Sequence, residues 1–377
     1  MLHDGYTDGL YALLPVWQSE FGLSYAGLAV LRALYYGTMG GLQVPGNRLI
    51  GRLGPRAALA LATFVAAAGY LLMALPFGFA GLCAGLVLAG IGSSVQHPRA
   101  SLLVSNTYGR ASRGPLGIYN FSGDLGKAAF PAVLALLLPV VAWRPAVGIM
   151  ACVGLAVALA LLLVVPRRPF VALVEDKFTA KSRAARGFGL LLTIGALDTA
   201  TRMGYLLFLP FLLHTRGGTE PVVGLGLALL FIGGALGKAA CGWLGQHLGV
   251  VWSVIATEVA TALLIAATLI LPLAPMLALL PLLGIVLNGT SSVLYGTVPD
   301  LAPKGDIGRG FALFYTGVIG AGGLAPIAYG AIADHSNRTV GVLAAALTAV
   351  VIVPLVLALR PTLLDNERAA LAERALG

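Results

Sequence analysis

The chain of 377 residues is 58% hydrophobic and only 10% charged, and its mean hydropathy is +0.91. A soluble protein of this size would carry roughly a quarter charged residues, so the composition excludes a soluble globular domain. The net charge of +9 does not indicate nucleic-acid binding, because the basic residues cluster at the ends of predicted helices rather than along one stripe.

Runs of about 20 apolar residues recur along the chain, and each is long enough to cross a hydrocarbon core of about 30 Å. Proline, glycine and charged residues separate these runs into twelve predicted transmembrane helices. They cover residues 1–20, 26–47, 57–76, 79–106, 113–139, 144–165, 188–213, 221–245, 250–271, 276–298, 309–333 and 339–359. The predicted fold class is therefore an all-α, polytopic membrane protein.

Lysine and arginine are distributed unevenly over the predicted loops. If the N-terminus is cytoplasmic, the cytoplasmic loops and tail hold 16 of these residues, whereas the opposite side holds three, Arg144, Arg216 and Arg338. Because cytoplasmic loops carry the excess of positive charge, we expect both termini to be cytoplasmic and the protein to lie in the inner membrane of the cell.

The two halves of the chain resemble each other at a nearly constant offset. Residues 88–94 (LAGIGSS) match 282–288 (LLGIVLN) at an offset of 194, and residues 113–119 (RGPLGIY) match 309–315 (RGFALFY) at 196. The offset also relates Gly54 to Gly249 and indicates an internal duplication. We predict an N-terminal six-helix bundle at residues 1–165, a cytoplasmic linker at 166–187, a C-terminal six-helix bundle at 188–360 and a cytoplasmic tail at 361–377.

The repeat also bears on the first predicted helix. Asp198 lies about ten residues into its helix, whereas its repeat mate Asp4 is the fourth residue of the chain. We therefore expect roughly ten further residues of this helix to precede Met1 in the natural protein.

Ten ionisable residues, five acidic and five basic, lie at predicted membrane depth. Each costs about 2.5–3.5 kcal/mol at a helix centre, so we expect them to face the interior, where they pair or line a watery cavity. The equal numbers of acids and bases favour pairing. These residues are Asp4, Asp8, Asp124, Asp198, Glu258, Arg32, Arg99, Lys127, Arg202 and Lys238.

The spacing of these residues indicates which of them share a helix face. Asp198 and Arg202 are four positions apart, and Asp124 and Lys127 are three apart, so each pair can meet on one face. Asp4 and Asp8 are also four positions apart and of like sign, and two such carboxylates in a low dielectric resist ionising together, which suits a proton carrier. The candidates for proton coupling are Asp4, Asp8, Asp124 and Asp198.

Other polar residues at this depth are candidates for substrate binding or gating. The substrate-binding candidates are Arg32, Asn120, Lys127, Arg202, Tyr11, Tyr36, Asn288 and Tyr295. The gating candidates are His97, Arg99 and Lys238. Structural interpretations stay open beside these: the Asp198–Arg202 pair can serve helix packing alone, Lys238 can reach toward the membrane surface, and tyrosines can be packing or interfacial residues.

The sequence contains no pattern for enzymatic or metal chemistry. The segment around Lys238, GGALGKAACG, lacks the first glycine and the Ser or Thr of a phosphate-binding loop. Five scattered histidines have no metal-ligand spacing, and the three cysteines form no CxxC motif. We therefore predict that the protein is not an enzyme and uses no cofactor or metal.

Three segments carry a family resemblance: HDGYTDGLYALLPVWQSEFGLS at residues 3–24, GIGSSVQHPRAS at 90–101 and YNFSGDLGKAAFP at 119–131. They resemble the fosmidomycin-resistance branch of the major facilitator superfamily, and the superfamily resemblance covers essentially the whole chain. It implies two pseudo-symmetric six-helix bundles that rock about a central cavity. Because the ninth span is usually peripheral in this architecture, Glu258 is interpreted as part of a structural pair.

The sequence departs from the superfamily in the loop after the second span. Within the pattern GxLaDRxGRR, the segment NRLIGRLGPR places Gly51 where the aspartate is expected, and GWLGQHLG places Gln246 there in the second half. The usual carboxylate latch on the cytoplasmic side is thus missing from both halves. We expect gating to depend on other pairs, such as those near Arg99.

The resemblance implies a secondary transporter that exports a small organic compound or drug in exchange for protons, by alternating access. Proton-coupled uptake of a small organic anion is the alternative that the cationic residues leave open. A non-transporting membrane receptor or scaffold is a further alternative. The expected partners are a small-molecule substrate, protons and the lipid bilayer, and we expect a monomer.

Overall fold

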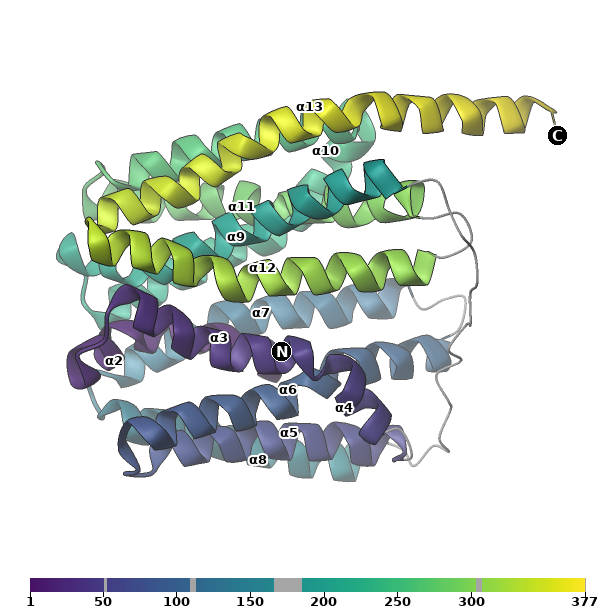
Figure 1. Ribbon diagram of the computed structural model, residues 1–377. Helices are drawn as coiled ribbons and strands as arrows, with labels where there is room; N and C mark the ends of the chain where they lie inside the picture. Colours follow the sequence, from purple (N-terminus) through teal and green to yellow (C-terminus); the bar gives the residue numbers. More distant parts are fainter. Residues whose placement is uncertain (51–52, 109–112, 166–184, 303–306, 377) are drawn as a thin grey trace. The chain divides into compact units, whose positions relative to one another are not determined.

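The computed structural model describes residues 1–50, 53–108, 113–165, 185–302 and 307–376, and every element in these ranges is a helix (Figure 1). The elements are α1 (Leu2–Gly9), η1 (Leu10–Leu13), α2 (Leu14–Phe21), α3 (Tyr25–Gly41), α4 (Gln43–Leu49), α5 (Pro55–Ala74), α6 (Gly78–Tyr108), α7 (Arg113–Leu137), α8 (Trp143–Val164), α9 (Ala185–Thr215), α10 (Glu220–Thr268), α11 (Leu273–Leu301), α12 (Ile307–His335) and α13 (Arg338–Leu376). All twelve predicted spans fall on helices, so the predicted all-α class is confirmed. Gly51 and most of the predicted linker lie outside the described residues.

The chain divides into two compact units. The first comprises residues 1–174 and 209–232, and the second comprises residues 175–208 and 233–377. Helices α9 and α10 therefore each contribute to both units. The predicted bundle boundaries at residues 165 and 188 remain a prediction.

The first predicted span is broken into α1, the 3₁₀ turn η1 and α2. Pro15 lies in the first turn of α2 and has no N–H to donate to the carbonyl of Tyr11, four residues earlier. The Leu14 amide donates to that carbonyl instead, as in a 3₁₀ turn. As a result, α1 is a separate helix of eight residues that carries both Asp4 and Asp8.

Helix α10 contains two predicted spans and changes direction at Gly249. This residue has φ 76° and ψ 166°, a backbone conformation that glycine adopts readily and other residues do not. Its repeat mate, Gly54, is the N-cap of α5. Both glycines of the repeat therefore mark the beginning of a helix, which is α5 in the first half and the second limb of α10 in the second.

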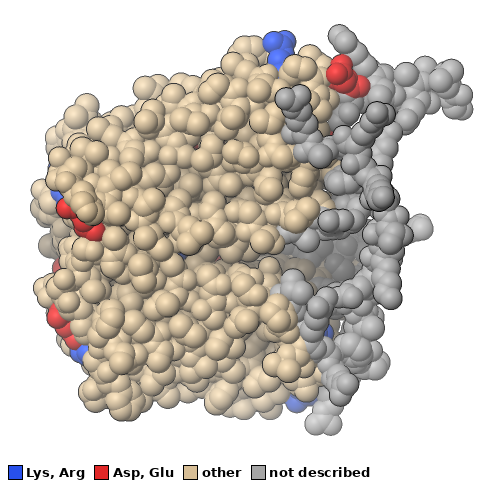
Figure 2. Space-filling view, in the orientation of Figure 1, with Lys and Arg blue, Asp and Glu red and all other residues tan. Residues whose placement is uncertain are grey.

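Eight helical segments of the described residues are long and apolar enough to cross a membrane. Many of their apolar side chains are exposed, among them Leu163 on α8, Leu263 on α10 and Leu347 on α13. Figure 2 shows a broad uncharged surface with charged residues near its edges. The four predicted spans outside this group are 1–20, 26–47, 113–139 and 188–213. The first two of these spans are divided into helices of 17 residues or fewer. The four spans together carry seven of the ten intramembrane charges.

Helices α5 and α6 run side by side and approach closely at small residues (Figure 1). A Cβ added to Gly69 on α5 would lie 2.4 Å from the backbone nitrogen of Ala89 on α6. Nothing lies within 4 Å of a Cβ added to Gly37 on α3. The two glycines thus offer a matched pair of sites, one crowded and one open.

Gly69→Ala is expected to destabilise the protein by about 1–3 kcal/mol, because overpacking forces backbone shifts between the two helices. Gly37→Ala is expected to leave stability unchanged or raise it by up to about 1 kcal/mol, since alanine is the better helix former. Thermal unfolding of both variants in the same detergent checks the difference. Equal melting temperatures for the two would contradict the packing of α5 against α6.

Candidate functional site

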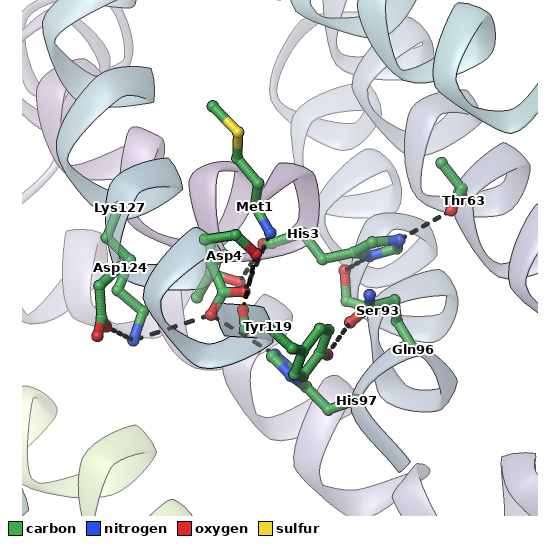
Figure 3. A network of polar contacts seen from close by, with 12 residues as sticks. Met1, His3, Asp4, Thr63, Ser93, Gln96, His97, Tyr119, Asp124 and Lys127 are labelled. Atoms are coloured by element: carbon green, nitrogen blue, oxygen red, sulfur yellow. Dashed lines mark hydrogen bonds and ion pairs between the residues drawn. The ribbon is translucent and has the colours of Figure 1, made fainter. Parts of the chain in front are cut away.

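Four charged or titratable side chains from α1, α6 and α7 meet in the first unit and form the Asp4 cluster: Asp4, His97, Asp124 and Lys127 (Figure 3). The Lys127 Nζ lies 3.8 Å from Asp4 Oδ1 and 3.4 Å from Asp124 Oδ1. The His97 Nε2 lies 3.5 Å from the same Asp4 oxygen, and the Met1 amine lies 3.8 Å from the other. One ammonium group is therefore shared by two carboxylates, and one of those carboxylates also has an imidazole as partner.

The members of the Asp4 cluster differ in their access to solvent. The side chains of Asp124 and Asp4 are only 9% and 12% exposed, whereas that of His97 is 42% exposed. The His97 Nδ1 lies 2.9 Å from the hydroxyl of Tyr119, which in turn donates to Gln96 at 3.1 Å. An imidazole that gains a proton becomes a donor at both nitrogens. The exposed His97 side chain can therefore carry a proton to the nearly buried carboxylate of Asp4 or away from it.

Glycine on α7 makes room for the Asp4 carboxylate. A Cβ added to Gly123 would lie 2.9 Å from Asp4 Oδ2, and one added to Gly126 would lie 2.1 Å from the carbonyl oxygen of Met1. The segment GDLGK therefore combines two glycines that admit α1 with Asp124 and Lys127, which face it. The predicted Asp124–Lys127 pair is present in this segment.

Beside the Asp4 cluster lies a buried polar network that the sequence reasoning missed. The His3 ring bonds the Ser93 hydroxyl at 3.0 Å and the Thr63 hydroxyl at 3.1 Å (Figure 3). The Tyr35 hydroxyl joins Ser93 at 2.7 Å and Thr7 at 3.2 Å. These bonds tie α1 to α3, α5 and α6, and so hold Asp4 in place. His3 and Thr7 are four positions apart on α1, but their partners come from three other helices and could not be identified from spacing.

Arg32 forms a second ionic contact with α1. Its guanidinium lies 3.8 Å from Asp8 Oδ1 and 4.0 Å from the centre of the Tyr11 ring, and it also donates to the carbonyl of Thr7. Both Arg32 and Asp8 are buried. Asp4 and Asp8 therefore contact different cations, Lys127 and Arg32, and their role in proton coupling remains a prediction.

The second unit holds the Asp198 cluster, formed by Asp198 and Arg202 on α9, Glu258 on the second limb of α10 and Asn288 on α11. Arg202 donates to the Asn288 side-chain oxygen at 3.4 Å and to the Thr199 hydroxyl at 3.5 Å. Asp198 and Glu258 are both buried and lie within electrostatic reach of each other and of Arg202. The interpretation of Glu258 as part of a structural pair remains a prediction.

Five further predicted site residues lie on α3, α6, α7, α10 and α11. Tyr295 on α11 packs against Phe314 and Tyr315, with ring centres 5.0 and 4.9 Å away. Asn120 on α7 is exposed, and Arg99 on α6 is buried. Tyr36 on α3 and Lys238 on α10 are half-buried. The roles assigned to all five remain predictions.

Comparison with known proteins identifies the family of the chain. The model of the Major Facilitator Superfamily matches twice, over residues 4–197 and 191–375. The chain is 24% identical to the fosmidomycin resistance protein of Escherichia coli (strain K12) over 353 residues, which cover 89% of this chain and 85% of that protein. It is 25% identical to a probable L-galactonate transporter of the same organism over 253 residues, 61% of this chain and 56% of that protein. That second match thus spans little more than half of the relative's length.

Solved structures show the same fold. A POT family transporter in complex with a thioalcohol-conjugated peptide superposes with a TM-score of 0.78 at 15% identity, covering 96% of this chain and 94% of that one. A bacterial homologue of the human lysosomal transporter Spinster, inward-facing and unoccupied, gives 0.75 at 16% identity, covering 97% and 95%. The match of the family model to both halves shows that the chain belongs to the Major Facilitator Superfamily of membrane transporters.

Proposed function

We propose that the protein is a proton-coupled exporter of a small organic compound in the inner membrane, and that the Asp4 cluster is its proton site. The observation that carries this proposal is the position of Lys127, within 3.8 Å of two carboxylates on different helices. A single proton can change which carboxylate this ammonium neutralises. Buried charges of this kind mark proton relays in transporters.

The proposed coupling follows from the contacts of Asp4. When His97 gains a proton, its positive charge attracts the Asp4 carboxylate more strongly. His97 then balances the charge of Asp4, and Lys127 is no longer needed for this. Lys127 then pairs with Asp124, on its own helix. Because Asp4 lies on α1 while Lys127 and Asp124 lie on α7, the proton weakens the link between these two helices. A ligand shifts a conformational equilibrium only by its differential affinity for the two states, and here the proton supplies that difference.

The proposed direction of transport is inferred from the similarity to two known proteins. Export is supported by the similarity to the fosmidomycin resistance protein, which covers 89% of this chain. The alternative, uptake of an organic anion, is supported by the similarity to a probable L-galactonate transporter and by the buried guanidinium of Arg32. Cytoplasmic termini and a monomeric state are part of the same proposal.

Gradient-driven accumulation in proteoliposomes tests this function. Fosmidomycin, L-galactonate and a cationic drug are each offered under a pH gradient of either orientation. Export by proton exchange predicts accumulation when the lumen is acidic, because protons leave as substrate enters. Uptake with protons predicts accumulation when the exterior is acidic. Accumulation that is equal under both gradients and without one would contradict proton coupling. Asp334→Asn, which neutralises an exposed carboxylate at the end of α12, is the control variant.

A further inference from the structure

Helix α1 is held against several neighbouring helices by hydrogen bonds that do not involve its carboxylates. The His3 ring bonds the hydroxyl of Thr63 on α5 and that of Ser93 on α6. The Tyr6 hydroxyl donates to the carbonyl of Met150 on α8 at 2.7 Å. A change of charge in the Asp4 cluster leaves these bonds in place, so α1 stays fixed to α5, α6 and α8.

The contact between α1 and α7 is of a different kind. Lys127 on α7 lies 3.8 Å from the Asp4 carboxylate, and elsewhere the two helices approach each other at glycines. A Cβ added to Gly5 on α1 would overlap the ring of Phe130 on α7. The ion pair is the contact that a change in the Asp4 cluster alters, so α7 is the helix that can move against a fixed α1.

Further along, α7 meets the beginning of α10. A Cβ added to Gly224 on α10 would overlap the Cβ of Ala135 and lie 3.1 Å from the carbonyl oxygen of Pro131. At a rise of 1.5 Å per residue, Ala135 lies about 12 Å along α7 from Lys127. Both contacts of α7 belong to the first unit, whereas α10 continues into the second unit from residue 233. A shift of α7 therefore changes the packing of a helix that reaches the second unit.

We infer that α7 transmits the state of the ion pair between Lys127 and Asp4 to α10, and that Gly224 is the positioning residue through which α10 responds. When the ion pair weakens, α7 shifts along its contact with α1. It displaces α10 as it moves, because the two helices touch at Gly224 with no room for a methyl group. The inference rests on the proposed function and deepens it by naming the route from the proton site to the second unit.

Hydrogen–deuterium exchange of the purified protein tests this transmission without a transport measurement. Asp4→Asn removes the ionic partner of Lys127 on α1. Amide exchange in peptides from residues 220–232 is then expected to become at least about fivefold faster than in wild type, the lower end of typical coupling between sites. Asp334→Asn is expected to leave it unchanged. Wild-type exchange of residues 220–232 in Asp4→Asn would overturn the inference.

Gly224→Ala tests the response of α10 in proteoliposomes. Its methyl group forces α7 and α10 apart, so the ratio of proton-driven accumulation to exchange without a gradient is expected to fall at least about fivefold. The double variant Gly224→Ala/Ala135→Gly removes the closest overlap, and this ratio is expected to recover to within about twofold of wild type. Gly37→Ala, at an open position on α3, is the control and is expected to keep the wild-type ratio.

The two measurements separate this inference from the proposed function. Equal losses of accumulation and exchange in Gly224→Ala would show that the contact serves packing alone, and a double variant without recovery would exclude Ala135 as its partner. Either result would overturn the inference. A wild-type protein that accumulates none of the compounds under either gradient would refute the proposed function, and amide exchange would still decide whether α10 responds to Asp4.

Discussion

Asp4→Asn is expected to abolish proton-driven accumulation of substrate in proteoliposomes while leaving the protein folded. Asparagine has nearly the same size as aspartate, so the packing against Gly123 is preserved. It carries no charge, so neither His97 nor Lys127 keeps an ionic partner on α1. Protonation of His97 then no longer changes the link between α1 and α7, and the coupling is lost.

Exchange of labelled for unlabelled substrate without a pH gradient separates coupling from binding. Asp4→Asn is expected to retain this exchange, because substrate can still cross when no proton needs to be moved. Asp334→Asn is expected to retain both exchange and accumulation. Proton-driven accumulation by Asp4→Asn at the wild-type level would remove Asp4 from the mechanism.

Arg32→Met is expected to destabilise the protein by about 3–5 kcal/mol, the usual cost of breaking a buried ion pair by removing one partner. Methionine has a similar length but leaves the buried carboxylate of Asp8 without its guanidinium and the carbonyl of Thr7 without its donor. The contact with the Tyr11 ring changes from cation–π to a contact of the thioether. Thermal unfolding in detergent measures the loss.

The double variant Asp8→Leu/Arg32→Met provides the control for this prediction. It removes both charges, and replacing a buried ion pair by apolar residues is often neutral or stabilising. The double variant is therefore expected to melt well above the single variant Arg32→Met. A double variant as unstable as the single one would show that Arg32 contributes through Thr7 and Tyr11 rather than through Asp8.

The sequence was sufficient to predict the helices because each is a long apolar run between glycine, proline and charged residues. It did not predict the breaks within them. Pro15 interrupts the first span, and Gly249 joins two predicted spans into α10 with a change of direction. Such breaks depend on local backbone geometry, whereas hydropathy averages over about 20 residues. Helix α13 continues through residues 361–376, which the sequence analysis assigned to the cytoplasmic tail.

Local spacing predicted the site only where both partners lie on one helix. Asp124 and Lys127 form the pair that their spacing indicates. The partners of Asp4, Asp8 and Glu258 all come from other helices, and no single sequence reveals which helices are neighbours. Spacing alone therefore related the two acids on α1 to each other, although Asp4 contacts Lys127 and Asp8 contacts Arg32.

The most direct test of the central claim, that protons and substrate move together through the Asp4 cluster, is a substrate-evoked pH change. Substrate is added to proteoliposomes that contain a pH-sensitive dye and have no imposed gradient. The account predicts that the lumen becomes more alkaline as substrate enters and protons leave, and that Asp4→Asn shows no such change. Entry of labelled substrate into wild-type proteoliposomes with no change in luminal pH would contradict it.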